Sequence, residues 1–134
     1  MNIRIPSIKG NYELTYGQSV NTHQHIAQLN KKYGCLCVGN HYGSGCDAGG
    51  QWKPENIRIG DKAYLEYETR NGLETIHHSG TYIAYLITIV KVINGRFYHA
   101  GQEVKPFDTT DLIVRSCVGS DSSHNYIVFF YKEI

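Results

Sequence analysis

The stretch Tyr82-Ile83-Ala84-Tyr85-Leu86-Ile87-Thr88-Ile89-Val90-Lys91-Val92 decides the fold of this 134-residue chain. It is rich in β-branched and aromatic residues and is followed by the turn pair Asn94-Gly95, which is typical of a β-strand. As a helix it would be too short to cross a bilayer, and Thr88 and Lys91 interrupt it. We therefore predict one long strand here.

Other segments repeat this composition around the long strand. Strands are predicted for residues 62–68, 111–115 and 126–131, and a further short strand for residues 35–38. The pair Asn71-Gly72 marks another turn. The pattern predicts an all-β fold, a closed or nearly closed barrel of about seven or eight strands with one or two short helices.

Two stretches account for the predicted helices. Residues 19–32 favour a helix, because Val20, Ile26 and Ala27 form a loose apolar stripe that Gly34 would end. Residues 52–59 contain a proline and predict a single helical turn before the chain reverses.

Composition limits both the domain count and the partners. A chain with 41% hydrophobic and 19% charged residues is expected to form one domain over residues 1–134, with a core that needs no disulfide or metal. Thirteen Lys and Arg against twelve Asp and Glu leave a net charge of +1, without a basic stripe, so nucleic acid is not expected as a partner. The opening residues MNIRIPSIKG lack the apolar run of a signal peptide, so no signal or anchor is visible.

Two residues suit nucleophilic chemistry. Cys117 ends a predicted strand and precedes a polar segment, so its thiol is held in place yet open to a substrate. The alternative is that Cys117 is a small buried hydrophobic residue. His41 follows another predicted strand in a glycine-rich loop, and an imidazole can both take and return a proton near neutral pH. Together they predict a cysteine–histidine pair for acyl transfer.

These residues resemble the motifs of a known family. Ile113-Val114-Arg115-Ser116-Cys117 is similar to the Thr-Leu-x-Thr-Cys signature of sortases, the cysteine transpeptidases of Gram-positive cell surfaces, with Cys117 as nucleophile and Ser116 replacing Thr. Val38-Gly39-Asn40-His41 resembles the segment that presents the family's histidine. Ile5-Pro6-Ser7-Ile8 resembles its opening strand, and Ile59-Gly60-Asp61-Lys62-Ala63-Tyr64-Leu65 resembles its Gly-Asp turn and the strand that follows. The four blocks occur in the family's order across nearly the whole chain.

The chain departs from the family at the catalytic arginine. Sortases carry an arginine on the strand after the cysteine, whereas this chain has none after Cys117. Asn125 or His124 falls at about that place, and an asparagine can donate a hydrogen bond to an oxyanion. Arg115 is the other candidate, because residues two apart on a strand share one side. The alternative for Arg115 is a surface cation beside Asp111.

The resemblance implies a mechanism and its partners. Cys117 would cleave a short sorting motif of a surface protein and pass the thioacyl group to an amine nucleophile or to water. Residues 94–111 would correspond to the loop that shapes the motif pocket, with Phe97, Tyr98 and Phe107 lining it and Ser116 beside the nucleophile. The resemblance also implies a monomer without a cofactor, at the extracellular face of a bacterial membrane or in the cell wall.

The remaining cysteines allow other interpretations. Cys35-x-Cys37-x3-His41-x4-Cys46 contains zinc-ligand types, but it lacks the two-residue gap that lets paired cysteines surround one ion, and no metal is predicted. A disulfide from Cys46 to Cys35 or Cys37 is an alternative. Buried reduced thiols are favoured for Cys35 and Cys37.

Two other function classes remain. One is a catalytically silent sortase relative that binds a peptide or glycan and lost turnover together with its arginine. The other is an aromatic-rich barrel that stacks single-stranded nucleic acid, suggested by 11 Tyr and 4 Phe. Such platforms come with a cationic groove, which this nearly neutral chain does not predict.

Overall fold

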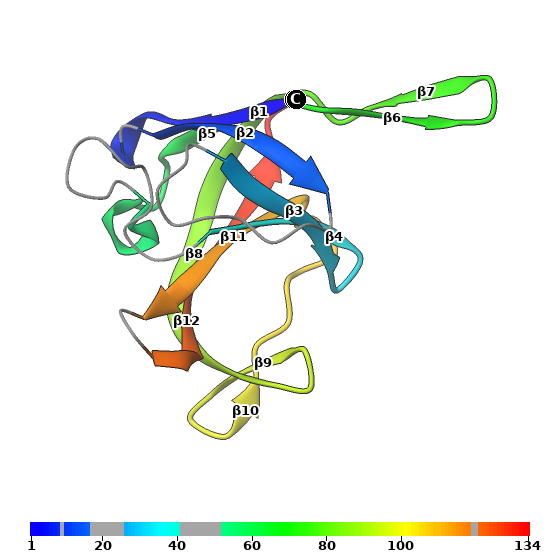
Figure 1. The fold of residues 1–134 in the computed structure, drawn as a ribbon. Helices are drawn as coiled ribbons and strands as arrows, with labels where there is room; N and C mark the ends of the chain where they lie inside the picture. Colours follow the sequence, from blue (N-terminus) through cyan, green and yellow to red (C-terminus); the bar gives the residue numbers. More distant parts are fainter. Residues whose placement is uncertain (9, 17–25, 41–51, 119–120) are drawn as a thin grey trace.

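The computed structural model describes residues 1–8, 10–16, 26–40, 52–118 and 121–134, and it shows a closed β-barrel (Figure 1). The ring order is β8-β12-β11-β4-β3-β2-β1-β5, and β5 pairs back to β8. Two pairings, β2 with β3 and β4 with β11, are parallel. Among the described residues, eight strands form the ring: β1 (Asn2–Ile5), β2 (Gly10–Tyr16), β3 (Ile26–Lys32), β4 (Cys35–Gly39), β5 (Lys62–Glu66), β8 (Gly80–Ile93), β11 (Leu112–Val118) and β12 (Asp121–Lys132).

The predicted all-β class is confirmed, and each predicted strand overlaps an observed one. The strand predicted over residues 62–68 is shorter in the structure, because β5 ends at Glu66 and Glu68 begins β6. The helical content of the described residues is two 3-10 turns, η1 (Pro6–Ile8) and η2 (Pro54–Asn56), and η2 lies where one helical turn is predicted. In the block Ile5-Pro6-Ser7-Ile8, β1 ends at Ile5 and the turn follows.

The helix predicted over residues 19–32 is wrong where the structure describes that segment. Residues 26–32 form β3, and residues 19–25 lie outside the described part. Ala27 and Leu29 are both fully buried, and this two-residue spacing is the period of a strand. Gln28, between them, points to the other side. Pairing with β2 on one edge and β4 on the other overrides the weak helical stripe.

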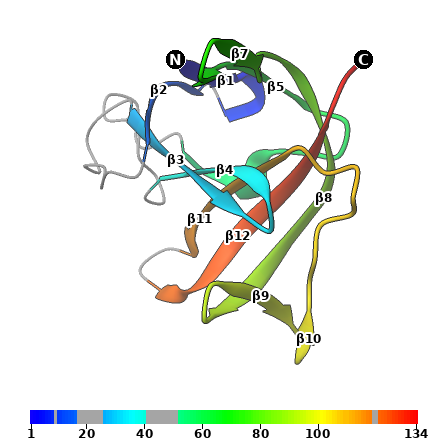
Figure 2. The ribbon, with the colours of Figure 1, turned by 90° about the vertical axis from the view of Figure 1, so that its right-hand side faces the viewer.

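Two hairpins lie outside the ring. β6 (Glu68–Asn71) and β7 (Glu74–His77) form a separate two-stranded sheet that projects from the barrel. β9 (Arg96–His99) and β10 (Gln102–Glu103) extend the sheet from β8, at the end of the molecule away from both termini (Figure 2). The predicted turns connect β6 to β7 and β8 to β9, and in the second turn Asn94 and Gly95 have φ values of 51° and 76°.

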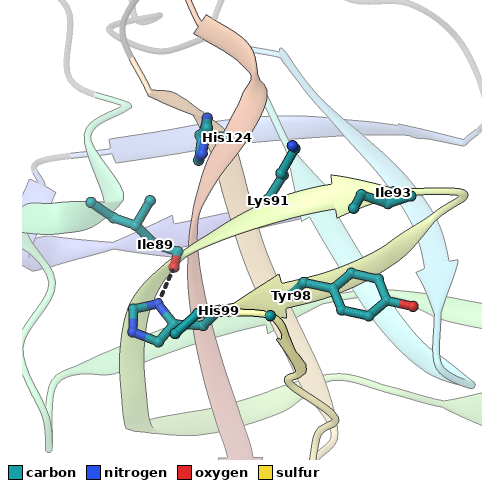
Figure 3. Close-up of a pocket in the computed structure, with 8 residues that line it drawn as sticks. Ile89, Lys91, Ile93, Tyr98, His99 and His124 are labelled. Atoms are coloured by element: carbon teal, nitrogen blue, oxygen red, sulfur yellow. Dashed lines mark hydrogen bonds between the residues drawn. The ribbon is translucent and has the colours of Figure 1, made fainter.

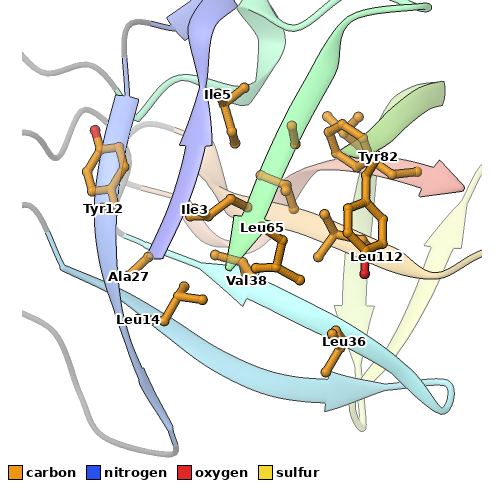
Figure 4. Close-up of a cluster of buried hydrophobic side chains, with 14 of the residues drawn as sticks. Ile3, Ile5, Tyr12, Leu14, Ala27, Leu36, Val38, Leu65, Tyr82 and Leu112 are labelled. Atoms are coloured by element: carbon orange, nitrogen blue, oxygen red, sulfur yellow. The ribbon is translucent and has the colours of Figure 1, made fainter. Parts of the chain in front are cut away.

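The inner core fills the barrel (Figure 4). Leu36 and Val38 of β4 point inward, and the residue between them points outward. Side chains from all eight ring strands contribute, so closing the ring is what removes this apolar surface from water. The labelled members in Figure 4 are Ile3, Ile5, Tyr12, Leu14, Ala27, Leu36, Val38, Leu65, Tyr82 and Leu112.

A second apolar cluster lies on the outer face of the barrel. We call it the outer cluster, and its buried members are Cys37, Val90, Phe97, Ile113, Ile127 and Phe129. Strands β4, β11 and β12 are therefore buried on both faces, which explains why their sequences read as continuous apolar runs. β8 contributes to both clusters as far as Ile87, and beyond it Ile89 and Ile93 are exposed on the inner face.

The β9–β10 hairpin is fastened to the outer face by Tyr33, in the turn between β3 and β4. The Tyr33 hydroxyl donates to Glu103 Oε2 at 2.8 Å and accepts from the Phe97 amide at 2.9 Å. Arg96 and Lys105 form ion pairs with the same Glu103 carboxylate, at 3.2 and 3.7 Å. This network holds the β9–β10 hairpin against the outer cluster.

Candidate functional site

The candidate nucleophile lies near the end of β11. Cys117 is directly opposite Asn125 of β12, and Arg115 is opposite Ile127. Directly paired positions on antiparallel strands belong to the same face, so positions 115, 117 and 125 all belong to the outer face of the sheet. The side chain of Cys117 lies outside the described part of the structure, and a register shift separates Cys117 from Val118.

Strand register separates Asn125 from His124, the two residues that fall at about the place of the family's arginine. Asn125 shares the face of position 117, whereas His124 pairs with Lys91 and belongs to the opposite face. Asn125 is 2% exposed and uncharged, and its neighbours on the outer face include the buried Ile127 and Val90. The position opposite Cys117 therefore holds the buried side-chain amide of Asn125 and no guanidinium group.

The third candidate, Arg115, pairs with Gly39 of the neighbouring strand β4. It is half-buried, and its Cγ would be 3.4 Å from a Cβ placed on Gly39 of β4, so the missing side chain of Gly39 leaves room for it. Burial raises the pKa of Cys37 to about 11, and the nearby positive charges of Arg115 and Lys32 partly oppose that shift. The guanidinium thus belongs to the β4 side of the outer face.

Trp52 and Asn40 both donate to the backbone of Arg115. The Arg115 carbonyl oxygen accepts a hydrogen bond from Trp52 Nε1 at 3.0 Å and from the backbone N–H of Asn40 at 3.4 Å. Asn40 is the last described residue before His41, and Trp52 is the first after residues 41–51. The last described residue before the segment 41–51 and the first one after it therefore both bind the Arg115 carbonyl group, two residues before Cys117.

Sequence reasoning missed the role of Trp52. The signal was present, because Trp52 is the single tryptophan of the chain and directly follows the glycine-rich segment that contains His41. It is fully buried and packs edge-on against Tyr12, with ring centroids 4.8 Å apart. His41 itself lies outside the described residues, so its pairing with Cys117 stays a prediction.

The other predicted substrate contacts lie in different surroundings and stay predictions. Ser116 is 2% exposed and lies opposite Tyr126, on the inner face. Phe97 is fully buried in the outer cluster, and Tyr98, the next residue along β9, belongs to the opposite face. Phe107 is 68% exposed and stacks on Tyr85, with ring centroids 5.6 Å apart. The structure does not bring these aromatic side chains to one surface.

Cys35 and Cys37 are free thiols among the described residues. The alternative disulfide from either of them to Cys46 involves a residue outside the described part of the structure. The Cys35 Sγ donates to the carbonyl oxygen of Thr110 at 3.4 Å, and burial raises the pKa of Cys35. Within the described residues no three metal-ligating side chains gather at one point, and Cys46 lies outside them. High pKa values make these two thiols poor nucleophiles near neutral pH.

Comparisons with known proteins identify the fold. No protein-family profile matches the sequence, and no curated protein sequence matches it. Sixty-one chains of solved structures do match. Sortase C from Streptococcus pneumoniae aligns with a TM-score of 0.67 and 16% identity, over 99% of this chain and 67% of that one.

Two further solved structures agree. A lid mutant of sortase A from Corynebacterium diphtheriae gives a TM-score of 0.64 at 14% identity, over 99% of this chain and 69% of its own. Sortase C-1 from Actinomyces oris gives 0.64 at 16% identity, over 99% and 73%. The TM-scores over 99% of this chain establish the shared fold, and at identities of 14–16% they establish the fold alone. Where the structure is described, none of its helices has the length and hydropathy of a membrane span.

Proposed function

We propose that this chain, which has the sortase fold, is a cysteine transpeptidase or peptidase that cleaves a short sorting motif with Cys117 as nucleophile. The observation that carries the proposal is the position of Cys117 at the end of β11, opposite Asn125 and beside the parallel strand β4 that leads to His41. Parallel neighbours end at the same edge of a sheet, which favours a meeting of the thiol and the imidazole there.

The proposed reaction has two acyl-transfer steps. The Cys117 thiolate attacks a peptide carbonyl carbon and forms a thioester as the carbon–nitrogen bond breaks, and the leaving amine takes a proton from His41. An incoming amine or water then gives its proton to His41 and attacks the thioester. The carbon–sulfur bond breaks and Cys117 returns as a thiolate, so each proton taken is given back.

Asn125 and Arg115 divide the work of the family's arginine in this proposal. The Asn125 amide donates a hydrogen bond to the oxyanion from the strand opposite the nucleophile. Arg115 supplies positive charge from the β4 side, two residues before Cys117. A neutral donor stabilises an oxyanion less than a charged one, so we expect slower turnover than an arginine would support.

The partners and the location are part of the same proposal. The donor is a peptide sorting motif of a surface protein, the acceptor is an amine, and the site of action is the extracellular face of a bacterial membrane or the cell wall. They rest on the likeness to sortases.

One observation favours a second candidate, a catalytically silent sortase-fold protein that binds a peptide or glycan. The residue opposite the nucleophile is a buried, uncharged asparagine. A site that lost the charge stabilising its transition state can keep its binding surface while losing turnover.

The test uses p-nitrophenyl acetate as an acyl donor, with the modified cysteine identified by mass spectrometry. We expect acetylation of Cys117 before the other three cysteines, loss of the fast phase in Cys117→Ala, and slower acylation in His41→Ala with an unchanged far-UV spectrum. Cys37→Ala is the matched control and should acylate normally. Equal labelling of all four cysteines would refute the proposal, whereas acetylation of Cys117 without deacylation by water or glycinamide would favour the silent relative.

A further inference from the structure

A groove of about 680 Å³ continues the inner face of β8 beyond the barrel (Figure 3). Along β8, Val90 packs in the outer cluster, and Ile89 and Lys91 on either side of it point to the other face. The groove is lined by Ile89, Lys91, Ile93, Tyr98, His99, Ala100, Gly101 and His124.

The lining has a repeating pattern along the strand. Ile89, Lys91 and Ile93 are alternate residues of β8, so their side chains follow one another at roughly 6.5 Å intervals. The two isoleucines are 42% and 43% exposed. Tyr98 of β9 and His124 of β12 are the cross-strand neighbours of Lys91. The centre of the groove is therefore a cation between two exposed apolar side chains.

The polar groups of the groove suit a peptide. His99 Nδ1 lies 3.1 Å from the carbonyl oxygen of Ile89, and because a carbonyl only accepts, Nδ1 carries the proton. In the neutral ring Nε2 is then an acceptor, which a backbone N–H can use. Among the residues that the structure describes, Lys91 forms no ion pair and no carboxylate lines the groove.

We propose that this groove binds an extended peptide that presents an acidic side chain between two apolar side chains at alternate positions. An extended chain has the same two-residue period as β8, so a central carboxylate meets Lys91 while its neighbours cover Ile89 and Ile93. A hollow surface of this volume fits a chain segment, whereas the flat headgroup layer of a membrane would meet only its rim.

The groove is separate from the proposed catalytic site. Asn125 shares the face of position 117, and the preceding residue, His124, lines the groove on the opposite face. A peptide in the groove therefore lies on the face opposite to that of position 117. The inference goes beyond the proposed acyl transfer and does not depend on it.

The test compares three pentapeptides, acetyl-Leu-Ser-X-Ser-Leu-amide with X as Glu, Gln or Lys, in titrations followed by amide chemical shifts. We expect the Glu peptide to shift the resonances of β8 and β9 and to bind about tenfold more tightly than the Lys peptide. Lys91→Glu should reverse this order. Lys62→Glu, at an exposed position on β5 outside the groove, is the matched control and should keep it.

Three outcomes would overturn the proposal. They are the absence of shifts in β8 and β9 with every peptide, equal binding of all three peptides, and an unchanged preference in Lys91→Glu. Lys91-dependent binding to phosphatidylglycerol vesicles without peptide binding would assign the groove to a lipid surface instead. Acylation of Cys117 by p-nitrophenyl acetate should be equal in Lys91→Glu and wild type, so a failure of this proposal is distinguishable from a failure of the proposed function.

Discussion

The indole nitrogen of Trp52 donates a 3.0 Å hydrogen bond to the carbonyl oxygen of Arg115, two residues before the candidate nucleophile. The same oxygen accepts a hydrogen bond from the backbone N–H of Asn40. One peptide group of β11 therefore fixes both described ends of the segment that contains His41. This contact links the inner core, where Trp52 packs against Tyr12, to the strand that carries Cys117.

Replacing Trp52 with phenylalanine should test this contact. Trp52→Phe keeps an aromatic ring but removes the donor, so we expect a loss of about 1 kcal/mol in the free energy of unfolding, from urea denaturation followed by circular dichroism. Trp52→Leu also removes the aromatic packing against Tyr12 and should lose more. Unchanged stability in Trp52→Phe would show that the hydrogen bond contributes nothing measurable.

The Tyr33 hydroxyl should stabilise the β9–β10 hairpin. Tyr33→Phe removes both the donor to Glu103 and the acceptor for the Phe97 amide. We expect about 1–2 kcal/mol of destabilisation and faster hydrogen exchange at the Phe97 amide. Tyr64→Phe is the control, because that ring packs on Arg4 in a cation–π contact that needs no hydroxyl. The prediction fails if the two variants exchange at the same rate at Phe97.

Stability should fall in alkaline solution because of Cys37. Burial raises the pKa of Cys37 from its ordinary 9.0 to about 11, so between these values the folded state keeps a proton that the unfolded state releases. This contribution is complete below pH 9 and is lost as pH rises to 11, with a total on the order of 3 kcal/mol. Cys37→Ala should show a shallower loss of stability over pH 9–11 in urea titrations. An identical slope in both proteins would contradict this origin.

Asn125 and Arg115 should affect acylation differently. If the amide donates to the oxyanion, Asn125→Ala lowers the rate of Cys117 acylation by about 10²-fold with little change in KM, as expected for an interaction made in the transition state. Arg115→Gln removes charge farther from the reacting carbonyl and should cost about tenfold, which Arg115→Lys restores. The reverse ranking of the two losses would transfer the oxyanion role to Arg115.

Most strands could be predicted from the sequence, but the segments that cover the two faces of the sheet could not. The apolar run of residues 82–92 predicts a strand, yet it does not say which segment covers the outer face of that strand. That cover is the β9–β10 hairpin, held by the contact from Tyr33 to Glu103, which are 70 residues apart. Residues 26–32 were misassigned for a related reason, because pairing on both edges outweighs local propensity.

For the candidate site, the sequence alone placed Cys117 at a strand end and left Asn125, His124 and Arg115 as alternatives for the missing arginine. Strand period and composition are local properties, so a single chain reveals them. Pairing is a long-range property that depends on closing the ring. Only the tertiary structure decided that Asn125 lies opposite Cys117, that His124 belongs to a groove on the other face, and that Trp52 contacts the Arg115 carbonyl.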